Sequence, residues 1–251
     1  LISQRSVYPH VDVPACTAHG VLLCSNMHSD TPSYAAAEHT LALILASYRQ
    51  IPQQVTSIKA GQWQSGVGRT LRGRTLGLYG YGRIARAVAA YAKAMGLKVQ
   101  WWGSEAGRAR AAAAGETVAV SREAFFKEAD IVSLHVRLKP ETRGLITAED
   151  LGQMQPRALF VNTSRSGLVA PGVLEAEIAK GRLHAAVDVF DQEPFLDREN
   201  ILLTHPNVLA TPHIGFVTED EFDMQFSDIF DQINAYAAGA PTHMINPEAY
   251  H

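Results

Sequence analysis

Three polar side chains in the second half of the chain have the types needed for proton transfer beside a carboxylate. Arg165, Glu193 and His213 each follow a short apolar run. Histidine titrates near neutral pH, so it can take a proton from an alcohol hydroxyl and return it in the reverse direction. A carboxylate on the second ring nitrogen fixes the tautomer and favours the protonated ring. A guanidinium offers a planar fork to a substrate carboxylate and to a neighbouring oxygen.

Each of these residues also has a purely structural interpretation. A lone arginine is usually solvated or in a surface ion pair, Glu193 could cap its loop, and His213 could pack behind Pro212. The three residues follow, in this order, a glycine-rich sequence of the kind that binds nucleotides. This order favours the catalytic interpretation. That interpretation depends on the elements that position them.

A repeated pattern of short apolar runs and helical segments covers residues 75–210. The apolar runs are 75–79, 98–102, 131–135, 158–162, 185–189 and 208–210. Helical patterns lie between most of them, and in the first one apolar residues share a face at Ile84, Val88, Tyr91 and Met95. Strands alternating with helices predict an α/β fold with a doubly wound parallel sheet, in which ligands bind at the carboxyl ends of the strands.

A glycine-rich turn follows the first run and opens a helix. Gly80 permits a tight turn, and Gly82 lets the backbone approach a pyrophosphate at the helix N-terminus, near Arg83 and Ile84. The usual third glycine is Ala85, a small residue that still allows close helix–strand packing. This strand–turn–helix context predicts a Rossmann dinucleotide-binding domain.

The residue that would choose between NAD and NADP is less clearly marked. An acid at the end of the second strand would hold the ribose hydroxyls of NAD, but that position is Gly103. Glu105 could take this role and favour NAD, whereas Ser104 with Arg108 could hold the 2′-phosphate of NADP. Both charged residues could also be solvated residues of a helix start. The sequence favours NAD slightly.

Two flanking segments lie outside this core and predict a second, smaller α/β domain. We expect residues 1–28 and 216–251 to form it, and residues 29–215 to form the nucleotide-binding domain. A helix over 33–51, ended by Pro52, would link the two. A second helix is predicted over residues 218–239, with an apolar face at Phe222, Phe226, Ile229, Phe230 and Ile233.

Composition narrows the class of protein. The 251 residues are 47% hydrophobic and 19% charged, with a net charge of −3 and no long basic or acidic run. Neither nucleic acid nor a membrane is therefore an expected partner. The two cysteines do not make a disulfide framework, which fits a cytoplasmic protein, and the histidines show no zinc-like spacing, so no metal site is expected. A metal-dependent hydrolase on an α/β sheet is accordingly a poor alternative.

A series of motifs along nearly the whole chain resembles the D-isomer-specific 2-hydroxyacid dehydrogenases. Besides the glycine loop, the motifs are residues 36–39, 71–77, 134–135, 140–146, 162–167, 188–194 and 211–215. The resemblance implies an NAD(P)-dependent oxidoreductase acting on a small D-2-hydroxy or 2-oxo acid. It implies a homodimer with much of its contact from residues 33–70.

The resemblance also implies a role for each matching residue. Arg165 would bind substrate, His213 would be the acid/base, Glu193 would be its partner, and Asp188 would hold the nicotinamide carboxamide. The pyrophosphate would be lined by the glycine loop. Further cofactor-binding candidates are Tyr81, His135 and Thr163, together with Ser104 and Glu105.

The smaller domain holds the remaining expectations. Its substrate loop matches Arg5, Ser6, Val7 and Tyr8, where the family is usually glycine-rich. The family's substrate domain begins well before the stretch that matches Leu1, so we expect this domain to be N-terminally incomplete. This leaves an alternative to catalysis. The chain could be a catalytically weak NAD(H)-binding sensor, like the corepressors that share the fold.

Overall fold

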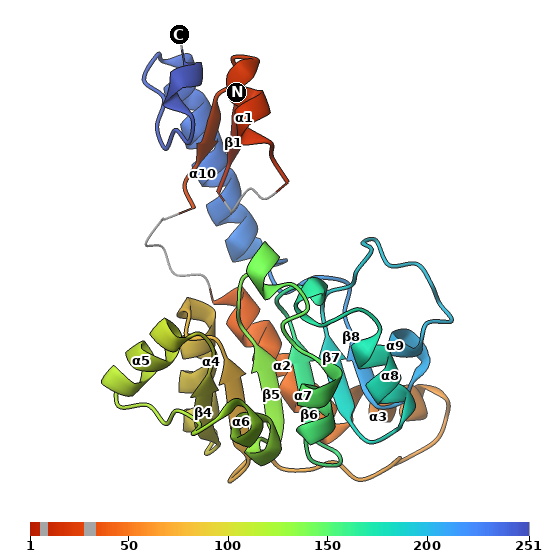
Figure 1. Ribbon diagram of the computed structural model, residues 1–251. Coiled ribbons are helices and arrows are strands. Elements are labelled where there is room, and N and C mark those ends of the chain that lie inside the picture. The colour runs from red at the N-terminus through yellow and green to blue at the C-terminus, as the bar shows by residue number, and fades with distance from the viewer. Residues whose placement is uncertain (6–9, 28–33, 251) are drawn as a thin grey trace. The chain divides into compact units, whose positions relative to one another are not determined.

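A computed structural model of the protein describes residues 1–5, 10–27 and 34–250 (Figure 1). The chain divides into two compact units. The described residues of 1–33 and 216–251 form the smaller unit, and residues 34–215 form the larger one. Within the described ranges, no helix is both long and apolar enough to cross a membrane.

The larger unit is built on one six-stranded parallel sheet, which confirms the predicted fold class. The strands are β3 (Thr75–Tyr79), β4 (Lys98–Trp102), β5 (Ile131–Leu134), β6 (Leu159–Asn162), β7 (His184–Val187) and β8 (Val208–Ala210). Their order across the sheet is β4-β3-β5-β6-β7-β8, with every neighbouring pair parallel. Three of the predicted runs differ from the strands by one or two residues, at one end or at both.

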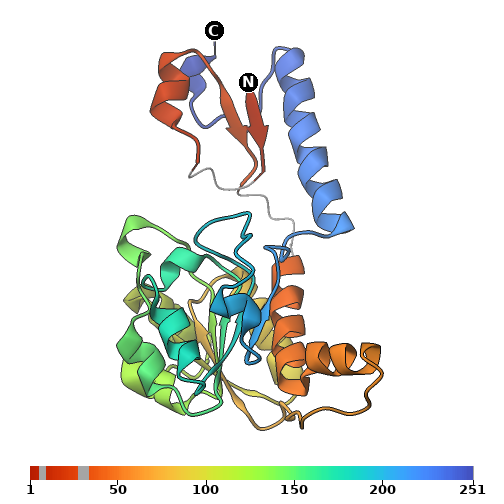
Figure 2. The same cartoon turned by 90° about the vertical axis from the view of Figure 1, so that its right-hand side faces the viewer.

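Helices cover both faces of this sheet (Figures 1 and 2). They are α2 (Ala35–Arg49), α3 (Ile51–Lys59), α4 (Arg83–Ala94), α5 (Glu105–Ala113), α6 (Arg122–Glu128), α7 (Ala148–Gln153), α8 (Val173–Ala179) and α9 (Ile201–Thr204), with short 3-10 turns η1 (Pro140–Thr142) and η2 (Ser166–Leu168). One apolar core lies between the sheet and α2 with α4, and another lies between the sheet and α6, α7 and α8. Burial on both faces explains why the strands are almost continuously apolar.

The buried face of α4 differs from the prediction. Ala85, Val88, Ala89 and Ala92 are buried, whereas Ile84 is 40% exposed. Small alanine side chains let the helix axis approach the sheet closely, so the packing follows side-chain size. Ile84 lies in the first turn, beside the glycine loop.

The helix predicted to run from 33 to 51 ends earlier. α2 stops at Arg49, and Gln50 adopts a left-handed conformation with φ of 53°. Pro52 does not end the helix but lies in the first turn of α3. Proline is favoured there because its missing N–H has no helical partner in a first turn.

The smaller unit pairs two parallel strands with a long helix. β1 (Ile2–Gln4) pairs with β2 (Leu23–Ser25), next to α1 (Val13–Ala18), α10 (Glu219–Ala237) and the turn η3 (Pro247–Ala249). The Ser3 hydroxyl donates to the Ile229 carbonyl at 2.9 Å, which joins β1 to α10. Figure 2 shows α10 running alongside both strands. Phe226 and Phe230, on the predicted apolar face of α10, are more than half exposed.

Candidate active site

The glycine loop lies where the strand order reverses. β4 and β5 flank β3, so the connections after β3 and β5 leave in opposite directions. Open α/β sheets bind their ligands at such a point, outside the carboxyl ends of the strands. Gly80 has φ of 111° and donates its N–H to the Trp102 carbonyl at 2.8 Å. A Cβ at Gly80 would overlap the carbonyl of His135. Only glycine therefore allows the ends of β3, β4 and β5 to come this close.

The start of α4 has the features of a pyrophosphate site. Gly82 is its N-cap and forms no side-chain cap hydrogen bond, and a Cβ built there would meet nothing within 4 Å. The first turn of an α-helix presents backbone N–H groups to anions. Open space above Gly82 fits the expected approach of a dinucleotide. The neighbouring Tyr81 ring packs edge-on against Trp101, with centroids 4.7 Å apart.

The end of β4 contains the residues proposed to choose the cofactor. The Ser104 hydroxyl oxygen accepts a hydrogen bond from the Gly107 N–H and caps α5. Glu105 is exposed in the first turn of that helix. The Arg108 guanidinium carbon lies 4.3 Å from the centroid of the Trp102 ring.

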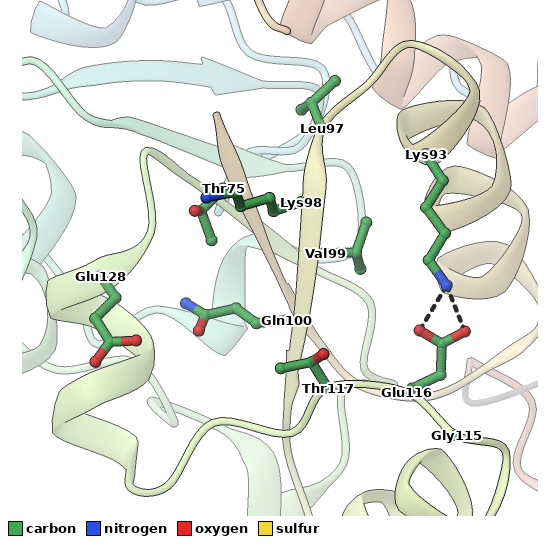
Figure 3. A pocket seen from close by; sticks show the side chains of 10 residues that line it. All are labelled: Thr75, Lys93, Leu97, Lys98, Val99, Gln100, Gly115, Glu116, Thr117 and Glu128. Carbon is green, nitrogen blue, oxygen red and sulfur yellow. Dashed lines mark hydrogen bonds and ion pairs between the residues drawn. The ribbon is translucent and has the colours of Figure 1, made fainter. Parts of the chain in front are cut away.

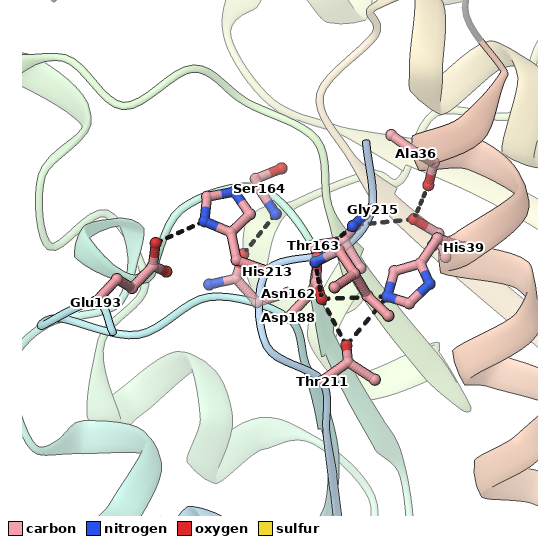
Figure 4. A network of polar contacts seen from close by, with 12 residues as sticks. Ala36, His39, Asn162, Thr163, Ser164, Asp188, Glu193, Thr211, His213 and Gly215 are labelled. Atoms are coloured by element: carbon pink, nitrogen blue, oxygen red, sulfur yellow. Dashed lines mark hydrogen bonds and ion pairs between the residues drawn. The ribbon is translucent and has the colours of Figure 1, made fainter. Parts of the chain in front are cut away.

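His213 and Glu193 form the central pair of the site (Figure 4). The Nδ1 atom of His213 lies 2.6 Å from Oε2 of Glu193, and both side chains are about one-third exposed or less. The other carboxylate oxygen, Oε1, accepts the Phe190 backbone N–H at 3.0 Å. Glu193 is thus fixed at one oxygen and orients the imidazole with the other. This places a carboxylate on the second ring nitrogen, as the acid–base chemistry requires.

Asp188 anchors the segment that carries His213. Its carboxylate accepts the Thr211 hydroxyl at 2.6 Å and the Ile214 and Gly215 backbone N–H groups, each at 2.9 Å. The Nε2 atom of His39 in α2 lies 3.2 Å away (Figure 4). Burial acts to raise the pKa of Asp188, but these hydrogen bonds outweigh it and hold the pKa below its usual value. The carboxylate is only 1% exposed, and the turn around His213 is built on it.

The loop after β6 presents Arg165. Asn162 donates from Nδ2 to the Arg165 carbonyl at 2.9 Å and accepts the Ser164 N–H at Oδ1. The Ser164 hydroxyl donates to the Leu134 carbonyl at the end of β5. The backbone on both sides of Arg165 is therefore fixed, while its guanidinium is exposed and donates to the Ser164 carbonyl.

Helix α2 supports the same region through side chains to which no sequence motif assigns a role. Thr163 is within 2.8 Å of Thr40, and the Thr40 hydroxyl donates to the Ala36 carbonyl. His39 contacts both Asp188 and Thr211. The motif at residues 36–39 marked this helix, but nothing in a single sequence assigns these side chains to the ends of β6, β7 and β8.

His135 follows β5 and faces the interior. Its Nε2 atom lies 2.9 Å from the Ser133 hydroxyl. Burial lowers the pKa of His135 to about 4, so the ring is neutral at physiological pH. The role of His135 in cofactor binding stays a prediction.

The predicted substrate loop is only partly described. Ser6, Val7 and Tyr8 lie outside the described residues. Arg5 pairs with Asp228 of α10, with Nε and Oδ2 2.5 Å apart. Among the described residues, no group of three or more His, Cys, Asp or Glu side chains is arranged to hold a metal ion.

A separate surface hollow lies at the other end of the sheet (Figure 3). Thr75 and Lys98, the first residues of β3 and β4, line it. Lys93 and Glu116 close one side with an ion pair at 2.6 Å. Because Gly80 and Gly103 follow the opposite ends of these strands, this hollow is not part of the candidate active site.

Comparison with known proteins identifies the family. The family profile of the D-isomer specific 2-hydroxyacid dehydrogenase NAD-binding domain matches residues 41–215. A D-3-phosphoglycerate dehydrogenase of Synechocystis sp. is 37% identical over 235 residues, which are 92% of this chain and 42% of that protein. A glyoxylate reductase of Thermococcus litoralis is 31% identical, over 99% of this chain and 77% of its own.

A solved structure of a similar protein supports the same family. The crystal structure of a phosphoglycerate oxidoreductase from Vibrio cholerae O395 has a TM-score of 0.88 and 40% identity, and covers 94% of this chain and 76% of its own. The chain spans less than half the length of the curated phosphoglycerate dehydrogenases it matches. Fold, motifs and similarity together show that the chain belongs to the D-isomer-specific 2-hydroxyacid dehydrogenase family and contains its NAD-binding Rossmann domain.

Proposed function

We propose that the chain transfers a hydride between NAD(P)H and C2 of a small D-2-hydroxy or 2-oxo acid. The observation that carries this proposal is the 2.6 Å contact between His213 and Glu193 at the carboxyl edge of a dinucleotide-binding sheet. An imidazole oriented by a carboxylate is what a carbonyl–alcohol interconversion needs for its proton. The names of similar proteins, which include dehydrogenases and a reductase, support the same class of reaction.

Each residue of the site has a separate role in the proposed reaction. The guanidinium of Arg165 binds the substrate carboxylate, leaving the C2 carbonyl to face His213. When bound, the reduced nicotinamide supplies the hydride that C2 accepts. The protonated His213 ring gives its Nε2 proton to the C2 oxygen, and Glu193 stabilises the charged ring before that transfer. Oxidation of a 2-hydroxy acid uses the same groups in reverse.

The cofactor site is assigned to the glycine loop. The open space above Gly82 and the uncapped start of α4 fit a pyrophosphate at this position. Thr163 and Asp188 directly follow the neighbouring strands β6 and β7 and are proposed to lie near the nicotinamide. Because the Asp188 carboxylate already accepts three hydrogen bonds, its main contribution is to hold the His213 segment.

A substrate panel tests the proposal. Consumption of NADH and NADPH is followed by absorbance with glyoxylate, hydroxypyruvate, pyruvate and bulkier 2-oxo acids, and binding of each cofactor is measured in parallel by tryptophan fluorescence. Oxidation of either cofactor with one of these acids is the expected result. Cofactor binding without turnover across the panel would contradict the proposal and favour a sensor of the same fold.

We further propose that the chain is a homodimer, with contacts from α2, α3 and the segment after α3. Ile51, Val55 and Ile58 of α3 are each more than 40% exposed, and Trp63 is 75% exposed. Apolar side chains gathered in this way are typical of a protein interface. Light scattering should give twice the chain mass, and Ile58→Asp should give the monomer, whereas Lys59→Asp should leave the dimer intact. A monomeric wild type would refute this proposal.

A further inference from the structure

The turn after β4 is the part of the cofactor site that can distinguish the two nicotinamide cofactors. NADP differs from NAD by a phosphate on the 2′-oxygen of the adenosine ribose, and Rossmann domains bind that ribose at the end of their second strand. Here Gly103 follows the strand, with φ of 149°. A Cβ on Gly103 would lie 3.4 Å from the Gly80 backbone nitrogen, so this turn packs directly against the glycine loop.

The position that would carry an acid therefore carries no side chain at all. A carboxylate there accepts hydrogen bonds from the ribose hydroxyls and repels a 2′-phosphate. Gly103 has no side chain that could bind the ribose hydroxyls or repel a 2′-phosphate. The residues next to it decide which ribose is preferred.

Arg108 is the best-fixed charged group at this turn. Its guanidinium lies 4.3 Å from the Trp102 ring centroid, in a cation–π contact, and its Nη1 donates to the Gly103 carbonyl at 3.1 Å. The side chain is half-buried, and no carboxylate forms an ion pair with it among the described residues. Its positive charge is held in place without a counter-ion, and the remaining guanidinium N–H groups are available to an anion.

Ser104 supplies a second donor at the same turn. Its oxygen accepts the Gly107 N–H at 3.3 Å, and this bond leaves the hydroxyl hydrogen to donate elsewhere. A hydroxyl beside a fixed guanidinium suits a phosphate, which accepts at several oxygens. The opposing charge is Glu105, which is exposed in the first turn of α5 and lacks the two contacts that fix Arg108. Solvent screens an exposed charge more strongly than a half-buried one.

We propose that Arg108 and Ser104 form a subsite for the 2′-phosphate, and that the protein binds NADPH more tightly than NADH. This inference rests on the proposed cofactor site. It replaces the slight preference for NAD that Glu105 suggested in the sequence, because Arg108 is fixed by two contacts, whereas the Glu105 side chain has no ion pair or hydrogen bond with any of the described residues.

The test measures the dissociation constants of NADPH and NADH for the 251-residue chain, by energy transfer from tryptophan to the reduced nicotinamide. The wild type should bind NADPH more tightly. Arg108→Ala should weaken NADPH on the order of 10- to 100-fold, the usual effect of removing a hydrogen bond to a charged group, and should change NADH little. Arg110→Ala is the matched control, since this arginine lies on the same helix and is exposed, and it should leave the ratio unchanged.

Two more variants keep the test informative if Arg108→Ala folds poorly. Arg108→Lys retains the charge and should keep part of the preference for NADPH. Ser104→Asp retains an N-cap acceptor but adds a negative charge, so it should reverse the preference to NADH.

Three outcomes would overturn the inference: tighter binding of NADH by the wild type, equal weakening of both cofactors in Arg108→Ala, or binding of neither cofactor. The measurement uses no substrate. A protein that prefers NADPH but reduces no 2-oxo acid would therefore support this subsite while contradicting the proposed reaction.

Discussion

Replacing Asp188 by asparagine should uncouple the His213 segment from the sheet. The two carboxylate oxygens accept from the Thr211 hydroxyl and from the Ile214 and Gly215 backbone N–H groups, at 2.6–2.9 Å. An asparagine has one acceptor oxygen, so in either orientation its NH₂ group faces a backbone N–H. At least one buried donor then loses its partner. The remaining hydrogen bonds are made to a neutral amide oxygen in place of a charged carboxylate. We expect a loss of about 2–4 kcal/mol in the free energy of unfolding.

Activity should fall further than stability explains. Displacing a catalytic group by about 1 Å can cost on the order of 100-fold in rate, so kcat of Asp188→Asn should drop roughly 10- to 100-fold. Asp150→Asn is the matched control. Asp150 is also buried, accepts from Arg122 and the Thr147 N–H, and has a pKa held below its usual value, since those hydrogen bonds outweigh burial. It should lose comparable stability but keep kcat.

The pH dependence gives an independent check. Because folding lowers the pKa of Asp188 below 3.8, its stabilisation is complete above that pH and is lost as the pH falls through the folded-state value. The stability difference between wild type and Asp188→Asn should therefore be the same at neutral pH and at about pH 5, and should shrink only below about pH 4. Urea unfolding and steady-state kinetics measure both quantities. If Asp188→Asn matched Asp150→Asn in stability and kept wild-type kcat, Asp188 would not position His213.

Three further substitutions test other parts of the site. Gly80→Ala combines φ of 111° with overlap on the His135 carbonyl, so it should cost about 2–4 kcal/mol of stability in urea unfolding. The added methyl group of Gly82→Ala would contact nothing within 4 Å, so this variant should keep its stability but bind the cofactor more weakly. Equal losses of stability in Gly80→Ala and Gly82→Ala would refute this account of the loop. His135 has a pKa of about 4 against 6.5 when exposed, so the unfolded state binds more protons between these values. Stability should fall by about 2 kcal/mol more in the wild type than in His135→Gln between pH 7 and pH 5, and parallel pH profiles would contradict this.

The sheet was predictable because its strands are buried on both faces. Continuous apolar runs such as Ile131–Leu134 between helical patterns leave few other folds, and the glycine loop marks the first crossover. Helix details were less predictable. A proline breaks a helix in its interior but is favoured in its first turn. Only the left-handed conformation of Gln50 shows that Pro52 lies in a first turn. On α4, the close approach of the helix to the sheet favours small alanine side chains at the contact, and Ile84 is not among the buried residues.

The candidate site was predictable as a set of residue types but not as a network. Arg165, Glu193 and His213 stand out because each follows a strand. The contacts of His39 and Thr40 join α2 to strands more than 100 residues away, and no local pattern encodes such pairing. Likewise, the stacking of Arg108 on Trp102 depends on the turn at Gly103, so the sequence could only pose the choice between NAD and NADP.

The most direct test of the central claim is the turnover of His213→Gln, with cofactor binding measured on the same preparation. His205→Gln is the control, because His205 lies just before β8, at the opposite end of that strand from His213. If His213 moves the proton to and from the C2 oxygen, His213→Gln should reduce kcat for the best 2-oxo acid roughly 100- to 10,000-fold and leave the cofactor dissociation constant unchanged. Wild-type turnover in His213→Gln would contradict the proposed mechanism.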